Sequence, residues 1–124
     1  MRLLWKKSKI LSLVICVLSL ISIIGFAAEN TYYYYKDGEK KYFTVRITID
    51  GQKINHQIVG TNNSYPSGYG KVYYIDSGGI GHIDNVYGTS TASYWQASNK
   101  APAYPYRAST TVTTIITRTV TAIK

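Results

Sequence analysis

The chain has 124 residues, a net charge of +8 and a single cysteine, Cys16, inside an apolar N-terminal stretch. Residues 28–124 contain no cysteine, which excludes a disulfide scaffold and a thiol nucleophile from this part of the chain. Their ten basic and six acidic side chains give a mild net charge of +4, without the clustered basic stripe of a nucleic-acid-binding protein.

Residues 1–27 are predicted to be a secretory signal peptide with a signal helix. Four basic residues precede an apolar run, and small residues around Ala27 suit cleavage after that position. An uncleaved membrane anchor is the alternative, because the run approaches the roughly 20 residues that cross a bilayer. In the first case residues 28–124 are secreted or associated with the cell envelope. In the second, only the N-terminal segment contacts the membrane and the C-terminus lies outside.

Residues 28–124 are predicted to form a single all-β domain. All 13 tyrosines lie there, together with many threonines and few leucines. Tyrosine and threonine favour half-exposed strands, whereas the good helix formers are scarce. Short strands separated by frequent turn signals indicate a small antiparallel β-sandwich or barrel built from hairpins.

Four consecutive tyrosines, Tyr32–Tyr35, belong to the first predicted strand of this domain. Successive side chains of a strand point to opposite faces, so one alternate pair should cap the core while the other pair stays outside. Asp37-Gly38 follows as a turn dipeptide that can return the chain against residues 42–49.

Residues 42–49 alternate strictly between apolar and polar side chains, which is typical of a half-buried strand. Asp50-Gly51 follows and is typical of a two-residue type I′ turn. With that turn Val45 would face His56, and both strands would present their apolar residues to the same side. The pattern predicts a hairpin and makes His56 a half-buried structural residue.

The rest of the chain is predicted to consist of short strands and turns. We expect a loop over residues 60–70, then strands over 71–75, 82–87 and 89–96, with a turn over 76–81. Pro102 and Pro105 argue against a central strand over residues 98–107, because proline lacks a backbone donor. Renewed alternation predicts one long closing strand over residues 109–124.

Patterns that indicate catalysis or metal binding are few. His82 and Asp84 are the metal candidates, because residues two apart on a strand point the same way, but two ligands do not define a site. Asp76, His82 and Ser77 could be arranged as orienter, base and nucleophile, although no spacing rule supports that trio. We therefore expect neither an enzyme nor a cofactor.

Aromatic residues near loops are the main functional signal. The candidate ligand-binding residues are Tyr65, Tyr69, Tyr94, Trp95, Tyr104 and Tyr106. Exposed aromatic rings accompanied by amides and hydroxyls suit stacking on sugar rings or docking on proteins. We expect a small secreted bacterial binding protein whose partner is a cell-envelope glycan or a surface protein, with lysine and arginine adding affinity for an anionic polymer.

Two alternatives remain open at this point. The first is a secreted antimicrobial or toxin-like peptide acting on another cell's envelope. Its basis is the small, basic, tyrosine-rich chain and the alternating strand over residues 109–124, which could insert into an oligomeric barrel. The second is self-association through exposed strand edges. Its basis is the segment TTVTTIIT from Thr110, which is apolar, β-prone and uncharged.

Overall fold

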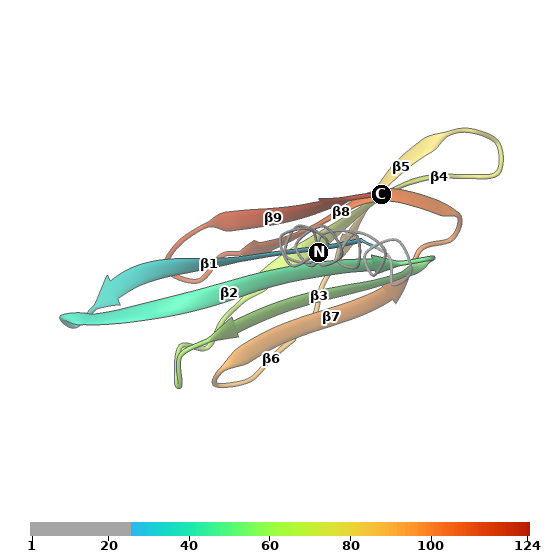
Figure 1. The fold of residues 1–124 in the computed structure, drawn as a ribbon. Coiled ribbons are helices and arrows are strands. Elements are labelled where there is room, and N and C mark those ends of the chain that lie inside the picture. The colour runs from blue at the N-terminus through green and yellow to red at the C-terminus, as the bar shows by residue number, and fades with distance from the viewer. Residues whose placement is uncertain (1–25) are drawn as a thin grey trace, which may run out of the picture.

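The computed structural model describes residues 26–124, which form two antiparallel sheets (Figure 1). The strands are β1 (Phe26–Lys36), β2 (Glu39–Asp50), β3 (Lys53–Gly60), β4 (Gly68–Ile75), β5 (Gly81–Val86), β6 (Thr89–Ser90), β7 (Tyr94–Lys100), β8 (Tyr104–Val112) and β9 (Arg118–Ile123). The described residues contain no helix, so the all-β prediction is confirmed for them. The predicted signal peptide and Cys16 lie outside the described residues, apart from Phe26 and Ala27, which belong to β1.

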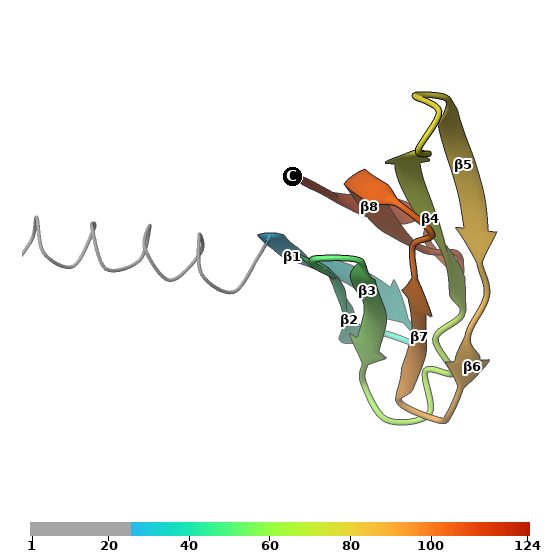
Figure 2. The same cartoon turned by 90° about the vertical axis from the view of Figure 1, so that its right-hand side faces the viewer.

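The first sheet has the strand order β1-β2-β3-β7-β6 and the second has the order β5-β4-β8-β9. The two sheets face each other as two layers (Figure 2) and enclose one core. Alternate residues of β2 and β3 supply all the isoleucines of the buried core cluster, because one face of each strand is buried. The largest fully buried apolar side chains are Trp95, Phe43, Ile47, Ile49, Ile54, Ile58, Val45, Val72, Val112 and Pro66.

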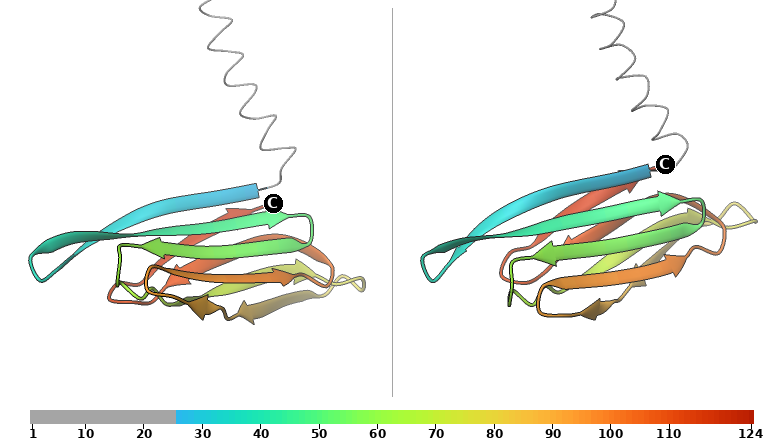
Figure 3. Two further views of the ribbon diagram at one scale, coloured as in Figure 1. Left: turned by 90° about the horizontal axis from the view of Figure 1, so that it is seen from below. Right: turned by 60° about the horizontal axis from the view of Figure 1, so that its bottom comes forward.

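The β1–β2 hairpin confirms the expectation for the four tyrosines. Asp37 and Gly38 both have positive φ angles, 53° and 76°, as a type I′ turn requires. Tyr34 is 6% exposed and stacks on Phe43 with ring centroids 4.8 Å apart, whereas Tyr33 and Tyr35 are 60% and 72% exposed. β3 ends opposite Phe43, so the hairpin extends past the end of the sheet (Figure 3).

The β2–β3 hairpin is present, but its predicted register is wrong by two residues. Asp50 pairs with Lys53, so the turn consists of Gly51 and Gln52, and His56 lies opposite Ile47. Gly51 alone has a positive φ, 62°, which places glycine at the first central position, as in a type II′ turn. A shift of two residues keeps every side chain on its predicted face, because the side-chain period of a strand is two.

The predicted strand over residues 89–96 is wrong. The chain forms the short strand β6 and then turns, so that β7 begins at Tyr94. The hydroxyl group of Thr91 accepts hydrogen bonds from the backbone amides of Ser93 and Tyr94, at 3.5 and 3.3 Å. Threonine therefore serves here as a turn residue rather than as a strand former.

The prediction that prolines exclude a central strand over residues 98–107 is wrong. Pro105 lies within β8, and β8 has a neighbouring strand on each side. β9 pairs with β8 only as far as Arg107, so Pro105 has no strand partner on that side. It also lies next to a β-bulge in the β4–β8 pairing. Strand edges and bulges are the positions where a sheet tolerates a missing backbone donor.

The single closing strand predicted over residues 109–124 is wrong. Its first part belongs to β8, its last part forms β9, and Ile115 has a positive φ of 59° in the turn between them. The backbone amide of Thr113 donates to the Ser67 carbonyl at 2.8 Å, so the turn bonds to the β3–β4 loop. Residues 110–112 of the segment TTVTTIIT pair with both β4 and β9, so they form no exposed sheet edge, while self-association remains an untested alternative.

His56 is more deeply buried than expected, with 1% of its surface exposed between the two sheets. A Cβ atom at Gly70 of β4 would lie 2.5 Å from the His56 ring, closer than atoms can approach. Glycine at this position therefore lets the imidazole fit between the sheets.

The substitution Gly70→Ala is expected to lower the free energy of unfolding by about 1–3 kcal/mol, because the added methyl group overpacks the core against His56. Gly81→Ala is the control, since a Cβ atom there meets nothing within 4 Å. Urea denaturation monitored by tryptophan fluorescence measures both. Equal stability of the two variants would contradict the account of the His56 site.

Candidate functional site

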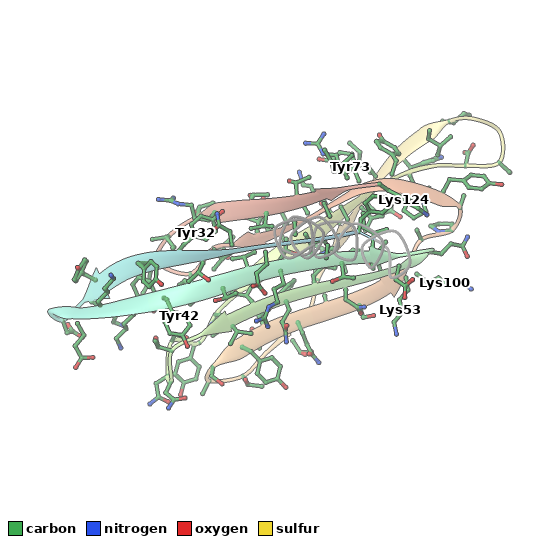
Figure 4. The ribbon with its side chains drawn as sticks, viewed as in Figure 1. Tyr32, Tyr42, Lys53, Tyr73, Lys100 and Lys124 are labelled. Atoms are coloured by element: carbon green, nitrogen blue, oxygen red, sulfur yellow. The ribbon has the colours of Figure 1, made fainter. Side chains whose placement is uncertain are left out.

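The outward side of the second sheet carries tyrosine and cationic side chains, which we call the tyrosine–cation face. Its members are Tyr69, Lys71 and Tyr73 of β4 with Tyr106 and Arg107 of β8. The three β4 residues alternate with Gly70 and Val72, which are buried, so they point away from the core. Figure 4 shows Tyr73 and Tyr42 on opposite sides of the molecule, in agreement with this arrangement.

A β-bulge brings two side chains of β8 onto this face next to Tyr73. Tyr73 pairs with Arg107 and Tyr74 pairs with Pro105, so Tyr106 is the extra residue of the bulge. The rings of Tyr73 and Tyr106 lie 6.3 Å apart at an interplanar angle of 54°. The bulge therefore adds a second aromatic ring beside a cation, where regular pairing would present one side chain.

The cations of the face lie over its tyrosine rings. The Arg107 guanidinium is 4.9 Å from the centroid of Tyr73, and the Lys71 ammonium is 6.0 Å from that of Tyr69. Such cation–π contacts hold long side chains in place on a surface. Among residues 26–124 no carboxylate shares the face, since Asp84 pairs with Val72 and therefore lies on the core side of β5. The face is therefore positive as well as aromatic.

A shallow hollow continues the face toward the end of the domain. Tyr104, Tyr106, Ile75 and Lys124 line it together with residues of the β2–β3 turn, and its volume is about 520 Å³. It offers apolar surface beside one further cation. Tyr106 lines the hollow and also belongs to the face, so the two form one continuous surface.

The six residues predicted to bind ligand do not form a single surface. Tyr69, Tyr104 and Tyr106 all lie on the second sheet, in strands rather than in loops, but Tyr69 is at the opposite end of the β4–β8 pair from Tyr104. Tyr65 lies in the loop before β4, and Tyr94 points outward from the first sheet. The expectation for Trp95 is wrong, because its side chain is 2% exposed and packs in the core.

Tyr73, Lys71 and Arg107 were not predicted as site residues. The period-two spacing of Tyr69, Lys71 and Tyr73 places them on one side of a strand and is visible in the sequence. Their meeting with Arg107 depends on the pairing of β4 with β8, which no local pattern indicates.

A second group of polar side chains lies at the β4–β5 turn. His82 Nε2 and Asp76 Oδ2 are 2.7 Å apart, and the His82 ring stacks on Tyr74 with centroids 5.0 Å apart. The hydrogen bond from His82 lowers the pKa of the Asp76 carboxyl, helped by two backbone amides of its own turn. Burial raises the pKa of the Tyr74 hydroxyl, and the negative charges of Asp84 and Asp76 add to this effect.

This group secures the turn and does not complete either of the predicted sites. In residues 26–124 no hydrogen bond joins Ser77 to His82, so the trio with Asp76 is not assembled. His82 and Asp84 share the core side of β5, but no group of three or more side chains in this part of the chain is placed to hold a metal ion.

His56 is a structural histidine rather than a surface base. Its Nδ1 lies 3.1 Å from both the Ser109 carbonyl and the Thr110 hydroxyl. The Thr110 hydroxyl donates its proton to the Arg46 carbonyl, so Nδ1 carries the hydrogen that bonds these two acceptors. Burial lowers the pKa of His56, and the hydrogen bond with Ser109 partly opposes that shift.

Comparison with family models, curated proteins and solved structures gives no match to this chain. The fold and the site therefore define a class only: an all-β domain of two antiparallel sheets with an exposed tyrosine–cation face.

The free energy of unfolding is expected to decrease as the pH falls, because the His56 imidazole is buried in its neutral form. The folded-state pKa of His56 lies below the ordinary value of 6.5, so the unfolded chain binds the extra proton first as the pH falls. The stability that neutral, buried His56 contributes to the folded state is fully present above about pH 6.5 and is lost progressively at lower pH.

His56→Asn keeps a donor near Ser109 and cannot titrate, so its free energy of unfolding should change less between pH 7.5 and pH 5 than that of the unsubstituted chain. Asp76 does not interfere, because its lowered pKa moves its titration below the ordinary value of 3.8. Urea titrations at several pH values test this expectation, and parallel pH profiles for the two chains would contradict it.

Proposed function

We propose that residues 28–124 form a small exported β-sandwich that binds an anionic glycan of a bacterial cell envelope through the tyrosine–cation face, without catalysing a reaction. The observation that carries this proposal is the contact of Arg107 and Tyr106 with Tyr73 on a face without carboxylates. The predicted signal peptide supports export, since such a segment would deliver the domain to the envelope.

The chemistry of the face suits an anionic polymer of sugars. Tyrosine rings stack on the apolar side of a sugar ring while their hydroxyl groups stay in water. Arg107 and Lys71 add charge-assisted hydrogen bonds to carboxylate or phosphate groups. The surface continues from Tyr69 to the hollow beside Tyr104, which suits an extended chain better than a compact ligand.

The alternative of a toxin-like peptide keeps the argument from a small, basic, tyrosine-rich chain but has less support from its C-terminal segment. Its second argument was one long strand over residues 109–124, whereas this segment is divided between β8, a turn and β9. A surface protein in place of a glycan stays an outcome of the binding test below.

The double variant Tyr73→Thr with Arg107→Gln is expected to weaken retention of the full chain on purified bacterial cell wall at least tenfold, a change of about 1.4 kcal/mol. Threonine keeps a strand-forming residue at the position, so the fold should persist. Retention should also fall in high salt, and after the anionic polymer has been extracted from the wall with acid.

The matched control is Tyr33→Thr with Lys40→Gln. These residues form the same kind of pair, with the Lys40 ammonium 4.5 Å from the Tyr33 centroid, but on the first sheet. The control should bind like the unsubstituted chain. Equal losses in both variants, or retention of the unsubstituted chain that is unchanged by removal of the anionic polymer, would overturn the proposal, and the second result would indicate another wall component or a protein partner.

A further inference from the structure

The outward side of the first sheet contains a groove of about 540 Å³, a volume in the range of small-molecule sites. Its polar and aromatic lining comes from β3, β7, β6 and the segment before β6. We call it the amide groove, and these lining residues are Asn55, Gln57, Tyr87, Thr89, Gln96 and Ser98. It lies on the opposite sheet from the tyrosine–cation face, so it is a separate surface.

The floor of the groove is built from two rows of cross-strand neighbours. Gln57 pairs with Gln96, which pairs in turn with Thr89, and Asn55 pairs with Ser98 in the next row. Side chains directly opposite each other in a sheet are close enough to contact one ligand together. Amide and hydroxyl groups both donate and accept hydrogen bonds, so the floor offers both functions at short intervals.

An ion pair beside the groove orients one of its amides. Arg46 Nη1 donates to Gln57 Oε1 at 3.1 Å, and the Arg46 guanidinium is itself held by the Glu29 carboxylate. The oxygen of Gln57 is therefore occupied, and its NH₂ group remains as the donor. An amide fixed in this way loses less conformational entropy when a ligand binds.

Tyr87 forms an aromatic wall at the side of this floor. It is 76% exposed and does not belong to the buried core cluster, so most of its side chain is accessible to a ligand. The next residue is Gly88, where a Cβ atom would lie 2.1 Å from the Gln96 carbonyl oxygen. Glycine thus allows the chain to run close against β7, which brings Tyr87 beside the two rows.

We propose that the amide groove is a second binding site that takes a neutral saccharide, with the sugar hydroxyls on the three amides and the sugar ring against Tyr87. Within residues 26–124 the groove is lined by no lysine, arginine, aspartate or glutamate. His56 also contributes to the lining, but its ring is buried and bonds to Ser109 and Thr110 in the core, so the groove favours a neutral ligand. It provides no series of apolar pockets for the side chains of a peptide strand. With both sites occupied, the domain would join an anionic polymer on one side to a neutral glycan on the other.

Saturation-transfer NMR on the full chain with three neutral disaccharides, diacetylchitobiose, cellobiose and maltose, tests the site. We expect transfer to at least one of them. Transfer should fall at least fivefold in Gln57→Leu with Gln96→Leu, and also in Tyr87→Ser. The second variant changes a highly exposed side chain, so a loss there does not arise from unfolding.

The variant Tyr73→Thr with Arg107→Gln serves as the control and should keep full transfer. Conversely, the groove variants should keep their retention on cell wall that carries anionic polymer, so failure of one site is distinguishable from failure of the other. Absence of transfer to all three disaccharides, or equal transfer from the groove variants and the unsubstituted chain, would overturn the proposal.

Discussion

Burial of one face of the central strands β2, β3, β4 and β8 is the constraint on which the rest of this structure depends. Phe43, Val45, Ile47 and Ile49 of β2 are fully buried, so the residues between them must point outward. The same rule applies to β4, where Tyr69, Lys71 and Tyr73 alternate with core residues. Two facing sheets thus leave two outward faces whose side chains are free of packing demands, and both proposed binding surfaces lie on them.

A polar connection through the core ties these faces together. His56 bonds to the Ser109 carbonyl and the Thr110 hydroxyl of the second sheet, and Thr110 donates to the Arg46 carbonyl of the first at 2.8 Å. The Arg46 side chain then points outward and holds Gln57 in the amide groove. Polar groups buried without partners are costly, so these bonds favour one alignment of the two sheets.

The sequence predicts local features of this molecule well and non-local ones poorly. The all-β class, both N-terminal hairpins and the split of the four tyrosines follow from alternation and turn dipeptides. The β2–β3 register was missed because Gly51 takes the first central turn position rather than the second. The alternation of apolar and polar residues over 109–124 continues through the turn between β8 and β9. The pattern alone therefore cannot show that the chain turns there. Trp95 looked like a surface residue only because its strand was misplaced, and the tyrosine–cation face needs the pairing of β4 with β8.

Hydroxyl-radical footprinting of the full chain, free and bound to purified cell wall, would locate the contact surface directly, because the tyrosines are spread over both sheets. The proposed function predicts that the wall protects Tyr69, Tyr73 and Tyr106 from oxidation while Tyr33, Tyr35 and Tyr65 stay as reactive as in the free chain. Protection of the second set with the first unchanged, or equal protection of both, would contradict the assignment of binding to the tyrosine–cation face.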